Sequence, residues 1–88
     1  MTSSVPWPEY TIPTANSRPN NIAAGPDGAL WFTEGSNNNI GRVTTGGGIT
    51  EYPVPTANSQ PGGITKGPDG ALWFTEGGGN KIGRASPL

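Results

Sequence analysis

The strongest constraint in the sequence is an internal repeat with a period of 42 residues. The segment from Gly25 to Gly35 recurs without change from Gly67 to Gly77. Over residues 9–42, 24 of the 34 positions match their counterparts 42 residues later, with no insertion or deletion. Periods of roughly 40–50 residues are typical of β-propeller blades or of two-helix repeats. The chain is therefore two copies of one structural unit, and the fold must be one of these two architectures.

The residue pattern favours strands over helices. Gly and Pro together occupy 25 of the 88 positions, and apolar residues do not recur at helical spacing. Short runs rich in aromatic and β-branched residues lie between turn residues instead, which is the signature of strands. The expected strands are an inner one (21–25 and 63–67), a second (29–34 and 71–76), a third (39–44 and 81–86) and an outer one (7–12 and 49–54).

The turns between these strands have a chemical basis. Pro26-Asp27-Gly28 and its repeat Pro68-Asp69-Gly70 offer a fixed φ, an Asx side chain and a residue free to adopt positive φ. They are expected to join the inner and second strands. The Gly-rich segment 45–48 is expected to turn the third strand into the outer one. The sequence therefore predicts an all-β fold, a β-propeller with two four-stranded blade units per chain.

Both faces of the second strand carry bulky side chains, as expected for a blade that lies between two other blades. Large flat residues such as tryptophan fill the space between blades well. The residues expected to pack between blades or between copies of the chain are Trp7, Tyr10, Ile12, Trp31, Phe32, Tyr52, Trp73, Phe74 and Ile82.

The order of the strands along the chain predicts self-assembly. The chain starts with an outer strand at 7–12, and its second unit stops after the third strand at 81–86. An incomplete blade leaves unpaired N–H and C=O groups along one edge, and an added strand satisfies them. We expect the N-terminal outer strand of one copy to complete the last blade of a neighbouring copy. Such a contact is head to tail and generates a closed ring when the rotation fits.

The sequence also resembles a known family. Gly-Pro-Asp-Gly-Ala-Leu-Trp-Phe-Thr-Glu, Asn-Lys-Ile-Gly-Arg at 80–84 and Ile-Thr-Glu-Tyr-Pro-Val-Pro at 49–55 resemble the repeats of the virginiamycin B lyase (streptogramin lyase) family. The resemblance implies blades from a seven-bladed ring and a lyase activity that uses histidine, glutamate and a divalent metal. Two blades per chain permit only even rings, so we expect eight blades from four copies, with six blades from three copies next. A step from seven to eight changes the angle between blades less than a step to six.

Candidate ligand-binding residues lie at the strand ends and in the loops. Glu34 and Glu76 end the second strands, and a ring of such carboxylates could bind a cation or a polar ligand. For each Glu, a structural bond to backbone N–H groups or to a neighbouring arginine, which holds the loop, is favoured over ligand binding. Loops on a rigid propeller often carry function. The full candidate set is Glu34, Glu76, Asn38, Asn80, Arg18 and Gln60.

Arg42 and Arg84 end the third strands. For them, an ion pair with Glu9 or Glu51 on the adjacent outer strand is favoured over anion recognition.

Composition excludes several classes of function. The net charge is −1, without a basic stripe for nucleic acid or an apolar run for a membrane span. No cysteine is present, and the N-terminus lacks the pattern of a signal peptide. We expect no cofactor, no metal site and no nucleic-acid or membrane partner, while the compartment stays open.

Three hypotheses for function remain. The first is a self-assembling propeller module, either a blade-pair fragment or a designed protein, without catalysis of its own. The second is a multivalent, lectin-like ligand-binding ring. The third is a streptogramin-lyase-like enzyme, which we disfavour because the chain contains no histidine to act as a general base near neutral pH.

Overall fold

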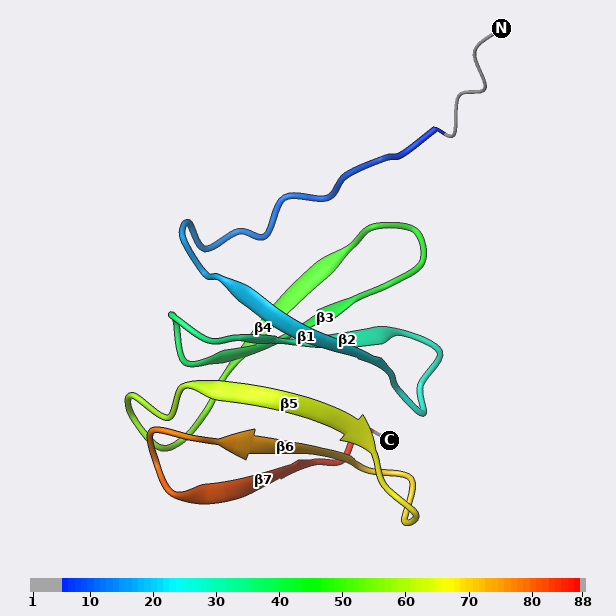
Figure 1. Ribbon diagram of the computed structural model, residues 1–88. Helices are drawn as coiled ribbons and strands as arrows, with labels where there is room; N and C mark the ends of the chain where they lie inside the picture. Colours follow the sequence, from blue (N-terminus) through cyan, green and yellow to red (C-terminus); the bar gives the residue numbers. More distant parts are fainter. Residues whose placement is uncertain (1–5, 88) are drawn as a thin grey trace, which may run out of the picture.

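Each repeat folds into one antiparallel sheet in the computed structural model, which describes residues 6–87 (Figure 1). The first sheet has the order β1-β2-β3-β4 and the second the order β5-β6-β7. The first sheet comprises β1 (Pro19–Ala24), β2 (Leu30–Glu34), β3 (Asn39–Val43) and β4 (Ile49–Pro53). The second comprises β5 (Pro61–Lys66), β6 (Leu72–Glu76) and β7 (Lys81–Ala85). Strands lie at seven of the eight expected places, with ends that differ from the expected ones by at most two residues.

The predicted turns form as their residues require. In the β1–β2 turn, Gly28 has a φ of 82°, and the Asp27 carboxylate accepts a hydrogen bond from the Ala29 amide at 3.2 Å. The β5–β6 turn repeats this geometry, with Gly70 at a φ of 83°. In the β3–β4 turn, the Thr44 amide donates to the Gly48 carbonyl at 2.9 Å. These tight turns fix the registers of the hairpins, so the residue pairs of β1 and β2 have direct counterparts in β5 and β6.

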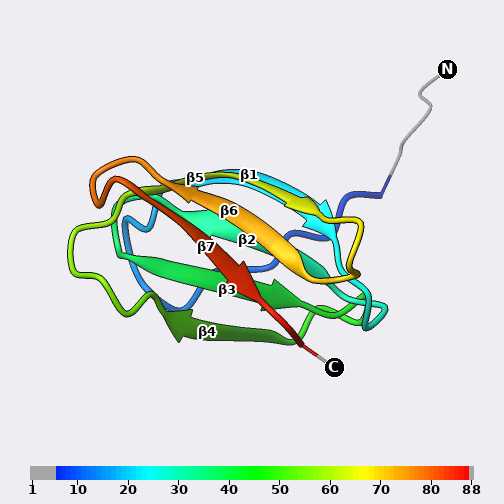
Figure 2. The same cartoon turned by 90° about the horizontal axis from the view of Figure 1, so that it is seen from below.

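The hydrophobic core lies between the two sheets, which stack face to face (Figure 2). Side chains alternate across a strand, so Trp31 and Thr33 of β2 point toward the second sheet. Leu72 and Phe74 of β6 point back toward the first sheet, and Leu72 is fully buried. Trp31 and Phe74, both expected to pack between blades, lie in this cluster.

The prediction of a strand at 7–12 differs from the structure. In the described part of the chain, the first strand begins at Pro19, and residues 7–12 have no strand partner within the single chain. The physical reason is that a strand forms only against a hydrogen-bonded neighbour. The neighbour expected for 7–12 is β7 of another copy, and that pairing stays a prediction.

Among residues 6–87, no helix is long and apolar enough to cross a membrane. Within the same residues, no three Asp or Glu side chains gather in a way that would hold a metal ion.

Candidate functional site

The junction between the sheets is built from residues whose repeat counterparts lie elsewhere. Its core consists of Trp31, Ile40, Val54, Ile64, Leu72 and Phe74. A shift of one repeat, forward or back, gives the counterparts Trp73, Ile82, Ile12, Ile22, Leu30 and Phe32. All six counterparts belong to the outward-facing sides of the two sheets or to the segment that crosses one of them. The repeat counterparts of the buried junction residues therefore lie on two open faces, at opposite ends of the molecule.

One half is the outer side of the second sheet, which we call the tail face and define by Thr65, Trp73, Thr75 and Ile82. Ile82 is 66% exposed, although its counterpart Ile40 is buried in the junction. Trp73 is half-buried, because Arg84 covers part of its ring at 5.6 Å from the centroid. The tail face thus presents an aromatic and an aliphatic side chain to the surroundings.

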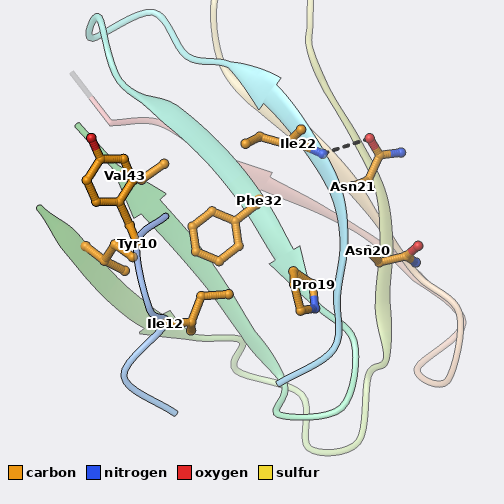
Figure 3. Close-up of a pocket in the computed structure, with 9 residues that line it drawn as sticks. Tyr10, Ile12, Pro19, Asn20, Asn21, Ile22, Phe32 and Val43 are labelled. Carbon is orange, nitrogen blue, oxygen red and sulfur yellow. Dashed lines mark hydrogen bonds between the residues drawn. The ribbon is translucent and has the colours of Figure 1, made fainter. Parts of the chain in front are cut away.

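The other half is the outer side of the first sheet, which we call the head face and define by Ile22, Leu30, Phe32 and Val43. Ile22 is 57% exposed and Leu30 is 38% exposed, whereas Phe32 is buried over Gly41. Tyr10 and Ile12 lie across this face and help to line a groove of about 330 Å³ (Figure 3). The head face is therefore an apolar surface that its own N-terminal segment covers in part.

Backbone hydrogen bonds show that this N-terminal segment already has the placement of the linker between the two sheets. The Ser36 amide donates to the Ser17 carbonyl at 3.1 Å, and the Gly78 amide donates to the Ser59 carbonyl at 2.8 Å. Ser17 and Ser59 are repeat counterparts, and both are buried. The segment before β1 is therefore held on the first sheet as the segment before β5 is held on the second.

The predicted aromatic residues divide into a paired and an unpaired set. Trp31 stacks on Tyr52, with ring centroids 5.6 Å apart and an interplanar angle of 21°. Their counterparts Trp73 and Tyr10 lie on the tail face and over the head face, at opposite ends of the chain. Trp7 is 73% exposed. Because Tyr10 and Trp73 lie at opposite ends of the molecule, they do not stack within one copy as Tyr52 and Trp31 do.

The expected ion pairs of the arginines with Glu9 or Glu51 are wrong. Arg42 pairs with Asp27 at 2.7 Å, and Arg84 pairs with Asp69 at 2.9 Å. The reason is that each Asp, placed by its tight turn, also accepts the indole N–H of the neighbouring tryptophan, at 3.0 Å for Asp27. These indole and guanidinium hydrogen bonds lower the pKa of both aspartates to about 2. Arg42 and Arg84 therefore serve to hold the turns and the tryptophan rings.

Glu34 is fully buried, and the structural role expected for it is also wrong. It lies beside the carboxyl of Glu51, and the Asn39 side-chain amide reaches it at 3.5 Å, rather than a backbone N–H or an arginine. Within residues 6–87, the Oε2 atoms of Glu34 and Glu51 are buried without a hydrogen-bond partner. Burial raises the pKa of Glu34 to about 7, and the neighbouring Glu51 acts in the same direction. Glu34 can therefore hold a proton near neutral pH, beside the carboxyl of Glu51.

Sequence reasoning missed Glu51 as the partner of Glu34. The strand register could have identified it. Glu34 lies opposite Asn39, and Asn39 lies opposite Pro53. Glu51 is two positions before Pro53 and so points to the same face of the sheet as Glu34. The counterpart Glu76 is also buried, and its Oε1 has no partner within the described residues. Lys81 lies opposite Glu76 in the register and donates instead to the Thr56 hydroxyl at 2.8 Å.

The structure separates the predicted ligand residues into two pockets. Asn38 and Gln60 line a polar pocket of about 540 Å³ together with Asn20, Ser36 and Asn58. Glu76 and Asn80 line another pocket of about 340 Å³ at the end of the second sheet. Arg18 is exposed with a φ of 51°, lines neither pocket, and accepts the Gly35 amide with its carbonyl at 3.2 Å. Glu34 is buried and lines neither pocket, so no single pocket brings the predicted residues together.

Comparison with known proteins agrees with the blade geometry. The model of the Virginiamycin B lyase family matches residues 1–87. A virginiamycin B lyase from Staphylococcus aureus is 56% identical with a TM-score of 0.87, and a streptogramin B lyase is 55% identical with a TM-score of 0.86. A catalytically inactive virginiamycin B lyase from Staphylococcus aureus with quinupristin matches equally well, at 56% identity and a TM-score of 0.87.

These alignments cover 89% of this chain but only 26–27% of the relatives, so the chain spans about a quarter of their length. The predicted resemblance is thereby confirmed, and the two sheets correspond to β-propeller blades. The chain belongs to the virginiamycin B lyase family.

Proposed function

We propose that this chain is a self-assembling propeller module whose copies join head to tail. The tail face of one copy packs on the head face of the next, and residues 7–12 of the next copy add to β7 as the fourth strand of the second sheet. One observation carries the proposal: every residue of the buried junction has its repeat counterpart on one of the two open faces or on the segment that crosses the head face. The second junction is chemically the same as the first, but it needs two copies.

The pairing of the added strand follows from the first sheet. There, Gly41 lies opposite Glu51 and Val43 lies opposite Ile49. The same register places Glu9 opposite Gly83 and Trp7 opposite Ala85. This addition satisfies the free backbone groups along β7. It also brings Tyr10 to the ring of Trp73, in the stacked geometry that Tyr52 and Trp31 already have.

The expected ring holds eight blades from four copies, and six blades from three copies is the other closed form. The contact is heterologous, so it continues until the ring closes. Association newly buries Ile22, Leu30 and Ile82, which the single chain leaves exposed. Full burial of one such aliphatic side chain stabilises by roughly 1.5–3 kcal/mol, and this gain opposes the loss of freedom on association.

Two single-face variants test the head-to-tail arrangement. Ile82→Glu blocks the tail face and Ile22→Glu blocks the head face, so that the two blocked faces also repel each other. Both positions are exposed, so each variant folds as a monomer. Mixed in equal amounts, they should form a dimer and stop, because one intact tail face meets one intact head face. Thr45→Arg, in the exposed β3–β4 turn, is the control and should assemble like the parent. Assembly of either variant alone, or no dimer in the mixture, would overturn the proposal.

A polar ligand site is the second candidate. The pocket of about 540 Å³ between the two sheets is lined by amide and hydroxyl side chains without a charged residue, which suits a neutral, hydrogen-bonding ligand such as a sugar. A ring of four copies would present this pocket repeatedly, as expected for a multivalent binder. A glycan array probed with the assembled protein tests this; reproducible binding that Asn20→Ala and Gln60→Ala abolish supports the site.

We propose no lyase activity for the 88-residue chain. It corresponds to about a quarter of the length of the lyases that it matches, and it contains no histidine. Metal-dependent turnover of a streptogramin B antibiotic by the pure chain, lost in Glu34→Gln, would contradict this view.

A further inference from the structure

Asn38 ties the two sheets of the chain together at the loop end of their junction. Its side-chain Nδ2 donates to the Val54 carbonyl at 3.0 Å, and its Oδ1 accepts the Ser59 amide at 2.9 Å and the Ser59 hydroxyl. The Val54 amide returns a bond to the Asn38 carbonyl at 2.8 Å. One asparagine in the β2–β3 loop thus fixes the path of the linker that leads into the next sheet. We call this set of bonds the asparagine clasp.

Asn80 is the repeat counterpart of Asn38, and its loop has the same conformation. The φ of Asn80 is 55° and that of Asn38 is 59°. The Gly79 amide donates to the Glu76 carbonyl at 3.1 Å, as the Asn37 amide donates to the Glu34 carbonyl at 3.2 Å. Asn80 is nevertheless exposed, and within residues 6–87 its side chain makes no hydrogen bond. The donor and acceptor geometry of the clasp is present at Asn80, but its partners are missing.

The missing partners lie at the other end of the chain. Ile12 is the repeat counterpart of Val54, and Ser17 is the counterpart of Ser59. Within residues 6–87, the Ile12 backbone takes part in no side-chain or loop hydrogen bond, and Ser17 donates none. Ser17 is buried in the same relation to the β2–β3 loop as Ser59 is to the β6–β7 loop. Ser17 is therefore held in place before any partner arrives, so little ordering of the chain is needed at that half of the clasp.

We propose that Asn80 closes the clasp on Ile12 and Ser17 of a second copy of this chain, and that this clasp determines the affinity of each junction. The inference rests on the head-to-tail assembly proposed above and names the polar contact within it. Asn80 Nδ2 donates to the Ile12 carbonyl of the next copy, and Asn80 Oδ1 accepts the amide and the hydroxyl of Ser17. These bonds supply direction and register, while the apolar faces supply most of the buried area.

Asn80→Gly tests the clasp without straining the backbone, because glycine adopts a φ of 55° freely. The matched control is Asn58→Gly, which removes an exposed asparagine of the same φ, 55°, whose side chain makes no hydrogen bond within residues 6–87. The readout is the concentration at which the assembly dissociates, followed by analytical ultracentrifugation. Thermal unfolding of the dissociated chains provides a separate measure of the fold.

Loss of three neutral hydrogen bonds should weaken each junction by roughly 100-fold. Asn80→Gly should therefore dissociate at much higher concentration than the parent, with unchanged unfolding of the monomer, and Asn58→Gly should assemble like the parent. If Asn80→Gly assembles as tightly as the parent, the clasp is refuted while the assembly stands. If the parent itself never assembles, the proposed function fails and the clasp with it.

Discussion

Replacement of Glu34 by glutamine should abolish a pH dependence of stability between about pH 4.5 and pH 7. The pKa of Glu34 rises from an ordinary value of 4.5 to about 7 in the folded chain, because the side chain is buried and lies beside Glu51. Between these values the folded state binds a proton that the unfolded state releases. The free energy of unfolding must then decrease as the pH rises, by at most about 1.4 kcal/mol per pH unit for one proton. Below pH 4.5 both states hold the proton, and the dependence ends.

The whole effect amounts to roughly 2 kcal/mol once solvent screening of the pair is allowed for. Glutamine has the shape of the protonated acid, keeps an oxygen for the Asn39 amide and carries no charge. Glu34→Gln should therefore match the parent near pH 4 and exceed its stability by about 2 kcal/mol at pH 8.

The assay is urea unfolding followed by tryptophan fluorescence from pH 4 to pH 8, at one fixed protein concentration because assembly shifts apparent stability. Asp27 and Asp69 do not interfere, because their pKa values are lowered to about 2 and the stability that they contribute is lost only below pH 4. The control is Glu9→Gln, whose side chain is exposed in the single chain. Equal pH profiles for Glu34→Gln and the parent would refute the assignment of the proton to this pair.

Two further substitutions test the packing and the turns. Gly41→Ala places a methyl group against the ring of Phe32 and should destabilise the chain by about 1–3 kcal/mol. Gly46→Ala, where the added methyl group meets only the Thr44 hydroxyl at 3.9 Å, should change stability little. Urea midpoints that coincide for the two variants would contradict the close approach at Gly41. Asp27→Ala removes the carboxylate that accepts hydrogen bonds from the indole of Trp31 and from Arg42. It should lower the free energy of unfolding, measured in urea, by about 1–3 kcal/mol. An unchanged urea midpoint would mean that water replaces these hydrogen bonds without loss of stability.

Much of the fold could be predicted because the repeat restricts the possibilities. The strand runs between Gly- and Pro-containing turns required hairpins, and a segment such as Pro26-Asp27-Gly28 has few other conformations. The segment at 7–12 was predicted from the same repeat, but the single chain gives it no hydrogen-bonded neighbour. Local sequence therefore identified the potential for a strand, whereas the formation of that strand depends on a partner.

Side-chain partners were harder to predict because they depend on register and on turn geometry. Arg42 was expected to pair across the strand with a glutamate, but the turn at Asp27 places a carboxylate closer. Glu34 and Glu51 are 17 positions apart in sequence, and only the pairing of both with β3 brings them to one face. The sequence also could not show which of two repeat counterparts is buried. Ile40 is buried and Ile82 is exposed, although both lie in nearly the same local sequence.

The most direct test of the central claim is the native mass of the unmodified chain, measured by light scattering after size exclusion over a wide range of concentration. Head-to-tail closure predicts one sharp species at four times the chain mass of 9.0 kDa, with three times that mass as the other closed form. Its population should grow with concentration at the expense of the monomer. A folded chain that stays at 9.0 kDa at every concentration would contradict the account, because the head and tail faces would then be stable without each other.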